Sequence, residues 1–191
     1  MSISEDGLRK NQANFASLSP LSFLERTRKT FPNQTAIEYK DYKLSYKQAG
    51  QRCDALANLI KNQNFNSGTT IAVMLPNIPV MWECHFGVPM ATGVLNAINT
   101  RLDSHTVQFI LEHGEAKLFI YDSEYSPIVE KALVNLKNPP TVIEFVDEVA
   151  GNKRSNFANK VNCLDYESEI KNFTGTTFEH LLPNCLLYTS D

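Results

Sequence analysis

One stretch near the middle of the chain, residues 71–103, limits most strongly what this protein can fold into. It starts with the apolar run Ile71–Leu75, continues after a proline turn with the long apolar segment Val80–Ala91, and closes with a second run, Val94–Ile98. Two short apolar runs around a longer one are typical of a strand–helix–strand unit in which both strands are buried. Such a crossover joins parallel strands, so the stretch predicts a parallel α/β sheet.

Patterns on both sides of this unit extend the alternation of strands and helices. The first predicted helix is capped by Ser22 and ends before Phe31, and its Phe23, Leu24 and Thr27 face inward. The second covers residues 46–63 and is capped by Ser45. Three more helices are predicted over residues 104–113, 127–136 and 166–172. The predicted strands outside the central unit are residues 35–39, 43–46, 117–122 and 141–146. This alternation favours a doubly wound sheet with flanking helices. The polar residues 147–162 predict a loop or a lobe junction.

The composition argues against several classes of protein. A net charge of −3 and a pI near 5.8 give no basic face of the kind that nucleic acids require. The four cysteines are far apart and form no Cys-x-x-Cys pair, so we expect free thiols and neither a zinc site nor a disulfide framework. Residues 1–14 lack the pattern of a signal peptide, and no apolar run approaches the roughly 20 residues that span a bilayer. We therefore expect a cytoplasmic protein with no nucleic-acid partner and no membrane span.

No complete catalytic motif is present in the sequence. The dinucleotide-binding glycine pattern, the Walker loop and the nucleophile elbow are all absent. Residues 174–177 superficially resemble a phosphate loop, but no lysine follows and Glu179 adds a negative charge, which favours a polar turn. The pair Thr189-Ser190 can open a phosphate-binding turn if glycines follow it. Considered without other information, an ordinary chain end is the simpler interpretation of that pair.

Two residues in or beside the central unit have to be weighed as functional groups. His85 lies inside the predicted helix beside Trp82 and Phe86, with no carboxylate or nucleophile at motif spacing, which favours a core or interface histidine over a catalytic base. Arg101 follows a strand, at the edge where open α/β sheets bind ligands. An ion pair with Asp103 or a bond to a loop carbonyl is the favoured alternative for it. The residues predict no catalytic group and no metal site.

Several separated phrases resemble the adenylate-forming acyl-CoA synthetases and occur in the order of that family. They are Phe31-Pro32-Asn33-Gln34-Thr35-Ala36, Leu44-Ser45-Tyr46, Leu75-Pro76-Asn77, the stretch from His85 to Leu102, and Tyr188-Thr189-Ser190. The stretch from His85 to Leu102 is similar to the branch that acts on short- and medium-chain carboxylates. The resemblance covers about residues 18–146 and the last few residues of the chain.

This resemblance implies a partial N-terminal subdomain of the adenylate-forming fold. The complete enzyme would activate a carboxylic acid, fatty or methylthio-alkanoic, with ATP to an acyl-adenylate and transfer the acyl group to coenzyme A. ATP, Mg²⁺ and coenzyme A are then its cofactors, and a small carboxylate is its substrate. Thr189 and Ser190 would begin the ATP phosphate loop. We expect residues 1–19 to be a mobile N-terminal segment and residues 20–191 to be an incomplete AMP-binding (adenylation) domain that is inactive alone.

The last residues depart from the family pattern. Asp191 stands where the family has glycine, and its carboxylate would repel phosphate. Leu182-Pro183-Asn184 also runs almost directly into Cys185, without the longer linker of the family. We hypothesise that Cys185–Asp191 is not native sequence.

Two alternatives to a fragment of an acyl-CoA ligase stay open. One is a stand-alone, non-catalytic α/β binding module. The other is a piece of another adenylate-forming enzyme, such as a domain that activates amino acids.

Overall fold

The computed structural model of the protein describes residues 19–134, 136–160 and 163–178. Its helices are α1 (Pro20–Thr30), α2 (Tyr46–Asn62), α3 (Pro79–Met90), α4 (Ser104–His113), α5 (Ser126–Leu133), α6 (Asn156–Lys160) and α7 (Tyr166–Asn172). Its strands are β1 (Thr35–Tyr39), β2 (Tyr42–Ser45), β3 (Thr70–Met74), β4 (Val94–Ala97), β5 (Leu118–Asp122), β6 (Thr141–Phe145) and β7 (Leu164–Asp165). Two short 3-10 turns, η1 (Ser123–Tyr125) and η2 (Glu148–Ala150), follow β5 and β6.

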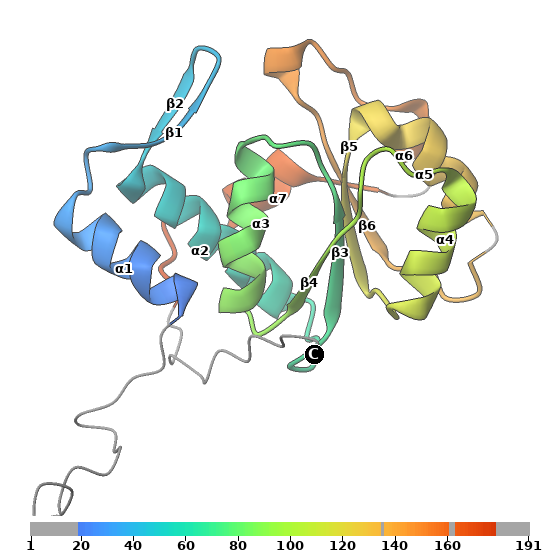
Figure 1. The fold of residues 1–191 in the computed structure, drawn as a ribbon, viewed down its shortest axis with the longest axis horizontal. Coiled ribbons are helices and arrows are strands. Elements are labelled where there is room, and N and C mark those ends of the chain that lie inside the picture. The colour runs from blue at the N-terminus through green and yellow to red at the C-terminus, as the bar shows by residue number, and fades with distance from the viewer. Residues whose placement is uncertain (1–18, 135, 161–162, 179–191) are drawn as a thin grey trace, which may run out of the picture.

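Five of these strands form one parallel sheet in the order β4-β3-β5-β6-β7. Figure 1 shows helices α2, α3 and α7 on one face of this sheet and α4, α5 and α6 on the other. The two remaining strands, β1 and β2, form a separate antiparallel hairpin. The predicted doubly wound α/β fold is therefore confirmed, and its strand order is one of the two common orders of such sheets.

Each face of the sheet carries its own hydrophobic core, because successive side chains of a strand point to opposite faces. Ile71, Val73 and Ile120 pack against α2, α3 and α7 in one cluster. Phe119 and Tyr121 belong to the opposite cluster, beneath α4, α5 and α6. All five residues of β5 are buried, as the centre of a two-sided parallel sheet requires.

Helices α2 and α3 pack against each other on the first face. Ser45 caps α2, as the sequence predicts, and the structure shows that Gln48 returns the bond in a capping box. The predicted inward positions are all buried: Ala49, Cys53, Leu56, Ala57 and Ile60. On α3, a Cβ added to Gly87 would lie 2.8 Å from Leu56 Cδ2. The glycine therefore allows α3 to approach α2 more closely than a larger residue would.

The predicted start of the first helix is wrong. Helix α1 begins at Pro20 with Ser19 as its cap, because proline suits the first helical position, where no N–H bond is lost. The buried side chains of this helix are Leu21 and Leu24, three residues apart on one face, and Phe23, which was predicted to face inward, is 55% exposed. The predicted loop 147–162 also contains η2 and the short helix α6.

A second correction concerns the central unit. Strand β3 is buried as predicted, but β4 is not, and Val94 is 45% exposed. Strand β4 is partly exposed because it is the outermost strand of the described sheet and has a neighbour on one side only. A short apolar run predicts a strand, but it does not predict which strand stands at the edge.

Candidate functional site

The carboxyl ends of the parallel strands meet at one edge of the sheet, which we call the carboxyl edge. From β3 the chain passes through α3 to β4, and from β4 it returns through α4 across β3 to β5. In open α/β sheets, ligands bind outside the carboxyl ends of the strands, at the point where the strand order reverses its direction across the sheet. The β1–β2 hairpin and η2 lie at this same edge, at the top of Figure 1. The site is therefore built from the residues that follow β3, β4, β5 and β6.

Asp122 ends β5 at this reversal and is 1% exposed. One carboxylate oxygen, Oδ1, accepts hydrogen bonds from the Glu124 N–H (2.9 Å) and the Asn152 side chain (3.0 Å). The other oxygen, Oδ2, is buried and has no partner among the described residues. Burial raises the pKa of Asp122 above its ordinary value, and the charge of Asp147 adds to that rise.

We expect Asp122→Asn to raise the midpoint of urea unfolding at pH 7 relative to the parent chain. A raised pKa in the folded state means that ionised Asp122 lowers stability above that pKa, and asparagine removes this cost. The gain should shrink as the pH falls toward about 4, near the ordinary aspartate pKa. Asp103→Asn should show the opposite pH dependence, because hydrogen bonds from Thr106 and His105 lower the pKa of Asp103. A stability difference for Asp122→Asn that does not change with pH would contradict this account.

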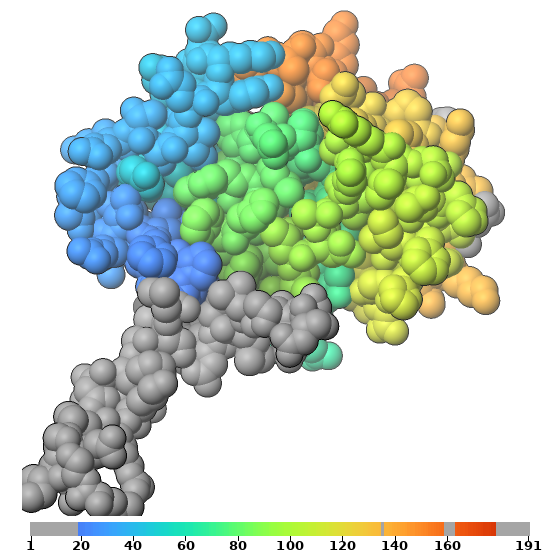
Figure 2. All heavy atoms as spheres, viewed as in Figure 1, coloured from blue at the N-terminus to red at the C-terminus, as the bar shows by residue number. Residues whose placement is uncertain are grey.

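The β1–β2 hairpin is fastened over the carboxyl edge by two polar contacts. The Tyr39 hydroxyl donates to Asp147 Oδ2 at 2.6 Å, and Lys40 Nζ donates to the Val149 carbonyl at 3.1 Å. The hydrogen bond to Asp147 raises the pKa of Tyr39 to about 12. Figure 2 shows the hairpin against the segment that follows β6, so one rim of the edge is closed.

Beneath the hairpin lies a pocket of about 390 Å³. Its walls come from the hairpin, α2, the start of α3, the end of β6 with the segment that follows it, and α7. They include Tyr39, Tyr42, Arg52, Glu83, Phe145 and Glu167. A pocket of this size can hold a small polar molecule. Arg52, Glu83 and Glu167 already bind one another in it, so these three groups do not offer a free nucleophile and base.

The centre of that pocket wall is a buried network that joins α2, α3 and α7. Arg52 donates to Glu83 at 2.5 Å and makes two bonds to Glu167, at 3.0 and 2.6 Å. The Tyr166 hydroxyl donates to the second oxygen of Glu83 at 2.7 Å. Burial raises the pKa of Glu83, whereas Arg52 and Tyr166 oppose that rise. We interpret the network as the support of the pocket and not as an acid–base pair.

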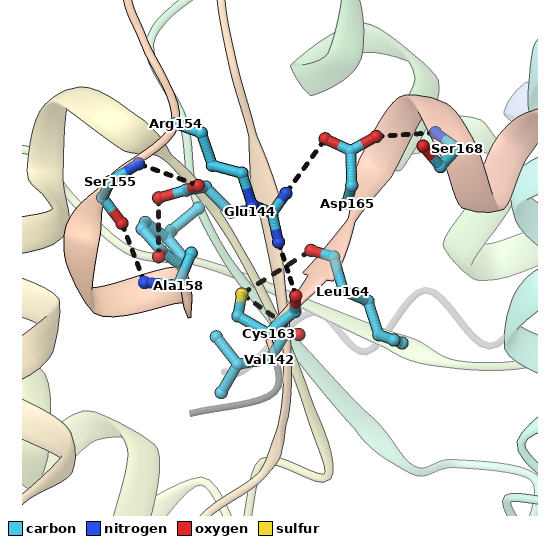
Figure 3. Close-up of polar contacts among 10 residues, drawn as sticks. Val142, Glu144, Arg154, Ser155, Ala158, Cys163, Leu164, Asp165 and Ser168 are labelled. Carbon is cyan, nitrogen blue, oxygen red and sulfur yellow. Dashed lines mark hydrogen bonds and ion pairs between the residues drawn. The ribbon is translucent and has the colours of Figure 1, made fainter. Parts of the chain in front are cut away.

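A further polar cluster holds β7 and α6 onto β6 (Figure 3). Arg154 lies between the Asp165 carboxylate, at 3.2 Å, and the Cys163 carbonyl, at 2.6 Å. Glu144 is fully buried on β6, where it accepts bonds from the Tyr121 hydroxyl (2.9 Å) and the Ser155 N–H (3.2 Å). These contacts occupy the groups concerned, so the cluster fixes the end of the sheet.

The two residues weighed in the sequence differ from their predicted environments. His85 is exposed on α3, with Nδ1 2.8 Å from the Met81 carbonyl, so it is not a core histidine, and the interface histidine stays a prediction. Arg101 is exposed after β4, and the structure shows no ion pair between it and Asp103. Asp103 instead caps α4. Arg101 therefore lies at the carboxyl edge with its guanidinium exposed.

The remaining predictions for the site concern the turn at residues 174–177, the phosphate contacts Thr189 and Ser190, and metal binding. The chain makes a polar turn at residues 173–175, within the predicted region, with Gly175 at a φ of 86°, and Thr176 and Thr177 follow it. Thr189 and Ser190 lie outside the described residues, as do residues 1–18 and the hypothesised non-native tail, Cys185–Asp191. Within the described ranges, no group of histidine, cysteine or acidic side chains could hold a metal ion, and no helix is long and apolar enough to cross a bilayer.

Comparison with known proteins identifies the family. The model of the family described as AMP-binding enzyme matches residues 24–190 of the chain. The chain belongs to this family. The fold agrees with this assignment. The crystal structure of the anthranilate CoA ligase AuaEII with anthranoyl-AMP is similar over 85% of this chain and 30% of that chain, with a TM-score of 0.72 and 18% identity. The adenylate-forming resemblance stated from the sequence is thus confirmed.

Two similar curated proteins are named as acid–CoA ligases. Acetate–CoA ligase CCL3 of Humulus lupulus is 35% identical over 169 residues, which are 85% of this chain and 30% of that protein. The peroxisomal trans-cinnamate:CoA ligase of Petunia hybrida is 43% identical over 128 residues, or 67% of this chain and 22% of that protein. The chain therefore spans less than a third of the length of these relatives.

Proposed function

We propose that the complete protein is an AMP-forming acid–CoA ligase. The observation that carries the proposal is the similarity of 85% of this chain to an acetate–CoA ligase at 35% identity. In this reaction a carboxylate oxygen attacks the α-phosphorus of ATP and pyrophosphate leaves. The thiol of coenzyme A then attacks the acyl carbonyl and AMP leaves. Adenylation is needed because a free carboxylate is a poor electrophile, and Mg²⁺ would neutralise the phosphates.

We propose a small carboxylic acid as the substrate, with fatty and methylthio-alkanoic acids as the first to test. The names of similar ligases include acetate, butyrate, cinnamate and benzoate, so the panel should contain these acids too. The test is the mass-spectrometric detection of acyl-CoA formed by the complete protein with ATP, Mg²⁺ and each acid. We expect thioester with at least one acid. The absence of thioester with every acid would count against the proposal.

We further propose that Thr189 and Ser190 begin the loop that binds the ATP phosphates. Thr189→Ala in the complete protein should then lower kcat by roughly 10²-fold, the usual effect of removing one donor that binds developing charge. Thr177→Ala is the matched control, because Thr177 is exposed after the polar turn and is expected to leave the rate unchanged. Steady-state AMP release measures both variants. Equal rates for Thr189→Ala and Thr177→Ala would remove Thr189 from the site.

We keep a cytoplasmic location as a proposal. Some of the similar ligases carry the word peroxisomal in their names, which makes the peroxisome the alternative to test. Fluorescence microscopy of the complete protein, tagged at either end in turn, distinguishes the two compartments. Diffuse fluorescence with both tags supports the cytoplasm, and punctate fluorescence that overlaps a peroxisomal marker contradicts it.

A further inference from the structure

The pocket beneath the hairpin carries a surplus of negative charge on its floor. In the network that joins α2, α3 and α7, the single guanidinium of Arg52 faces the two carboxylates of Glu83 and Glu167. The Tyr166 hydroxyl adds a hydrogen bond to Glu83 but no charge. Buried charges are normally paired with opposite ones. The floor therefore keeps one negative charge that no cation of the network offsets.

A second carboxylate without a paired cation lies at the rim of the pocket. Asp147 is 3% exposed, and its partners are the Tyr39 hydroxyl and the Ala150 N–H, neither of which carries a charge. The ion pairs that the structure shows among the described residues do not include Asp147. A positive charge inside the pocket would therefore be attracted both to its floor and to its rim.

The remaining charged side chains of the wall do not remove this surplus. Arg154 lies 3.2 Å from Asp165 and offsets that carboxylate alone. Glu148 and Lys171 are both exposed and of opposite sign. Of the described residues that line the pocket, five are acidic and two are basic. A wall of this composition attracts cations and repels anions.

Aromatic and aliphatic side chains form the other part of the wall. Tyr39 and Tyr42 come from the hairpin and Phe145 from the end of β6, and Ile78 and Val80 lie at the start of α3. The faces of aromatic rings attract cations, and groups of such rings recognise ammonium ligands. The aliphatic side chains can cover the alkyl groups of the same ligand.

The chain itself places an ammonium group against this wall. Lys40 Nζ lies 5.5 Å from the centroid of the Tyr39 ring and donates to the Val149 carbonyl at 3.1 Å. Tyr39 and Val149 both line the pocket, whereas Lys40 is not among its lining residues. Figure 2 shows the hairpin in contact with the segment after β6, where this bond is made. An aromatic face and an oxygen of the wall thus already bind one ammonium group at the rim.

A metal ion suits this wall less well than an organic cation. Within the part of the chain that the structure describes, no group of histidine, cysteine or acidic side chains could hold a metal ion. Calcium and magnesium also require a set of oxygen ligands, whereas much of this wall consists of rings and alkyl groups. The floor carboxylates, which already bind Arg52, can still attract a cation at longer range.

We propose that this pocket binds a small organic ammonium ion, with its charge toward the floor carboxylates and its alkyl groups against the rings and aliphatic side chains. The inference goes beyond the acid–CoA ligase proposal, because ATP, coenzyme A and carboxylic acids are anions. A failure of the thioester assay would leave it standing, and a failure of the tests below would leave the ligase proposal standing.

The first test is isothermal titration calorimetry of the complete protein with choline, in a buffer free of organic amines. The control ligand is the neutral isostere of choline, in which a carbon atom replaces the nitrogen. We expect choline to bind with a Kd below about 1 mM and the isostere to bind at least about tenfold more weakly. Weaker binding of choline than this, or equal binding of the two molecules, would overturn the proposal.

The second test uses two charge variants with opposite expected effects. Glu167→Gln removes the surplus charge of the floor and should weaken choline binding at least about fivefold, whereas Lys171→Met removes an exposed cation of the wall and should tighten it about twofold. Glu112→Gln is the control, because Glu112 is exposed on α4, on the opposite face of the sheet. Changes in the same direction for both variants, or no change beyond that of the control, would contradict the proposed site.

A third variant tests the rings without altering any charge. Tyr42→Leu removes one aromatic face and should weaken choline binding at least about fivefold while leaving the binding of the isostere nearly unchanged. Phe109→Leu, which removes an exposed ring from α4, is the matched control. Urea unfolding of each variant verifies that it is folded. A loss of choline affinity in Tyr42→Leu no larger than in Phe109→Leu would place the binding of choline elsewhere and overturn the proposal.

Discussion

Replacing Arg52 with methionine is expected to lower the free energy of unfolding by about 3–5 kcal/mol. Arg52 is the cation that neutralises Glu83, whose side chain is fully buried on α3. Removing it leaves an uncompensated charge in the core, and the two bonds to Glu167 are lost as well. Urea unfolding followed by the fluorescence of Trp82, the one tryptophan of the sequence, measures this change.

Two further variants separate the loss of a buried pair from the loss of any positive charge. Lys43→Met removes a cation whose pair with Glu38 is exposed on both sides, so it should cost less than about 1 kcal/mol. Arg52→Met combined with Glu83→Leu removes both charges and should recover part of the loss. If Arg52→Met cost no more than Lys43→Met, the network would not be the support that we describe.

The second large effect is expected in the other core, where Phe119→Ala should cost about 3–5 kcal/mol. Phe119 lies on the central strand β5, is 0% exposed and packs in the cluster beneath α4 and α5. Truncating its ring both removes buried apolar surface and leaves a cavity. The same urea titration measures the change.

Phe109→Ala is the matched control for that experiment. Phe109 is 58% exposed on α4 and stacks on His113 with ring centroids 5.3 Å apart. Its loss should change the free energy of unfolding by less than about 1 kcal/mol, because little buried surface is involved. Similar costs for Phe119→Ala and Phe109→Ala would contradict the assignment of β5 to the centre of the sheet.

Hydrophobic periodicity was enough to predict most of the fold. The inward positions of α2 and the apolar runs of β3 and β5 follow from local spacing, and tertiary packing agrees with them. The edge position of β4 could not be predicted, because it depends on which strands pair and not on the residues of β4. The start of α1 was placed three residues late, since both Ser19 and Ser22 are acceptable caps and only Ser19 is followed by Pro20.

The polar groups of the carboxyl edge were predicted less well. Glu83 offered a signal, because a lone carboxylate inside the apolar segment Val80–Ala91 needs a buried partner. That partner, Arg52, lies on another helix, and Tyr166 is 83 residues away in the sequence. The bond between Tyr39 and Asp147 likewise joins residues 108 positions apart. Local patterns cannot predict such pairs, and the predicted phosphate contacts Thr189 and Ser190 remain predictions.

The most direct test of the proposed function is the exchange of labelled pyrophosphate into ATP by the complete protein, with Mg²⁺ and a panel of carboxylic acids but without coenzyme A. An AMP-forming ligase makes the acyl-adenylate reversibly, so we predict exchange that requires one of the acids and is absent without it. A folded protein that shows no acid-dependent exchange with any of them would contradict the account and favour a non-catalytic binding role for this fold.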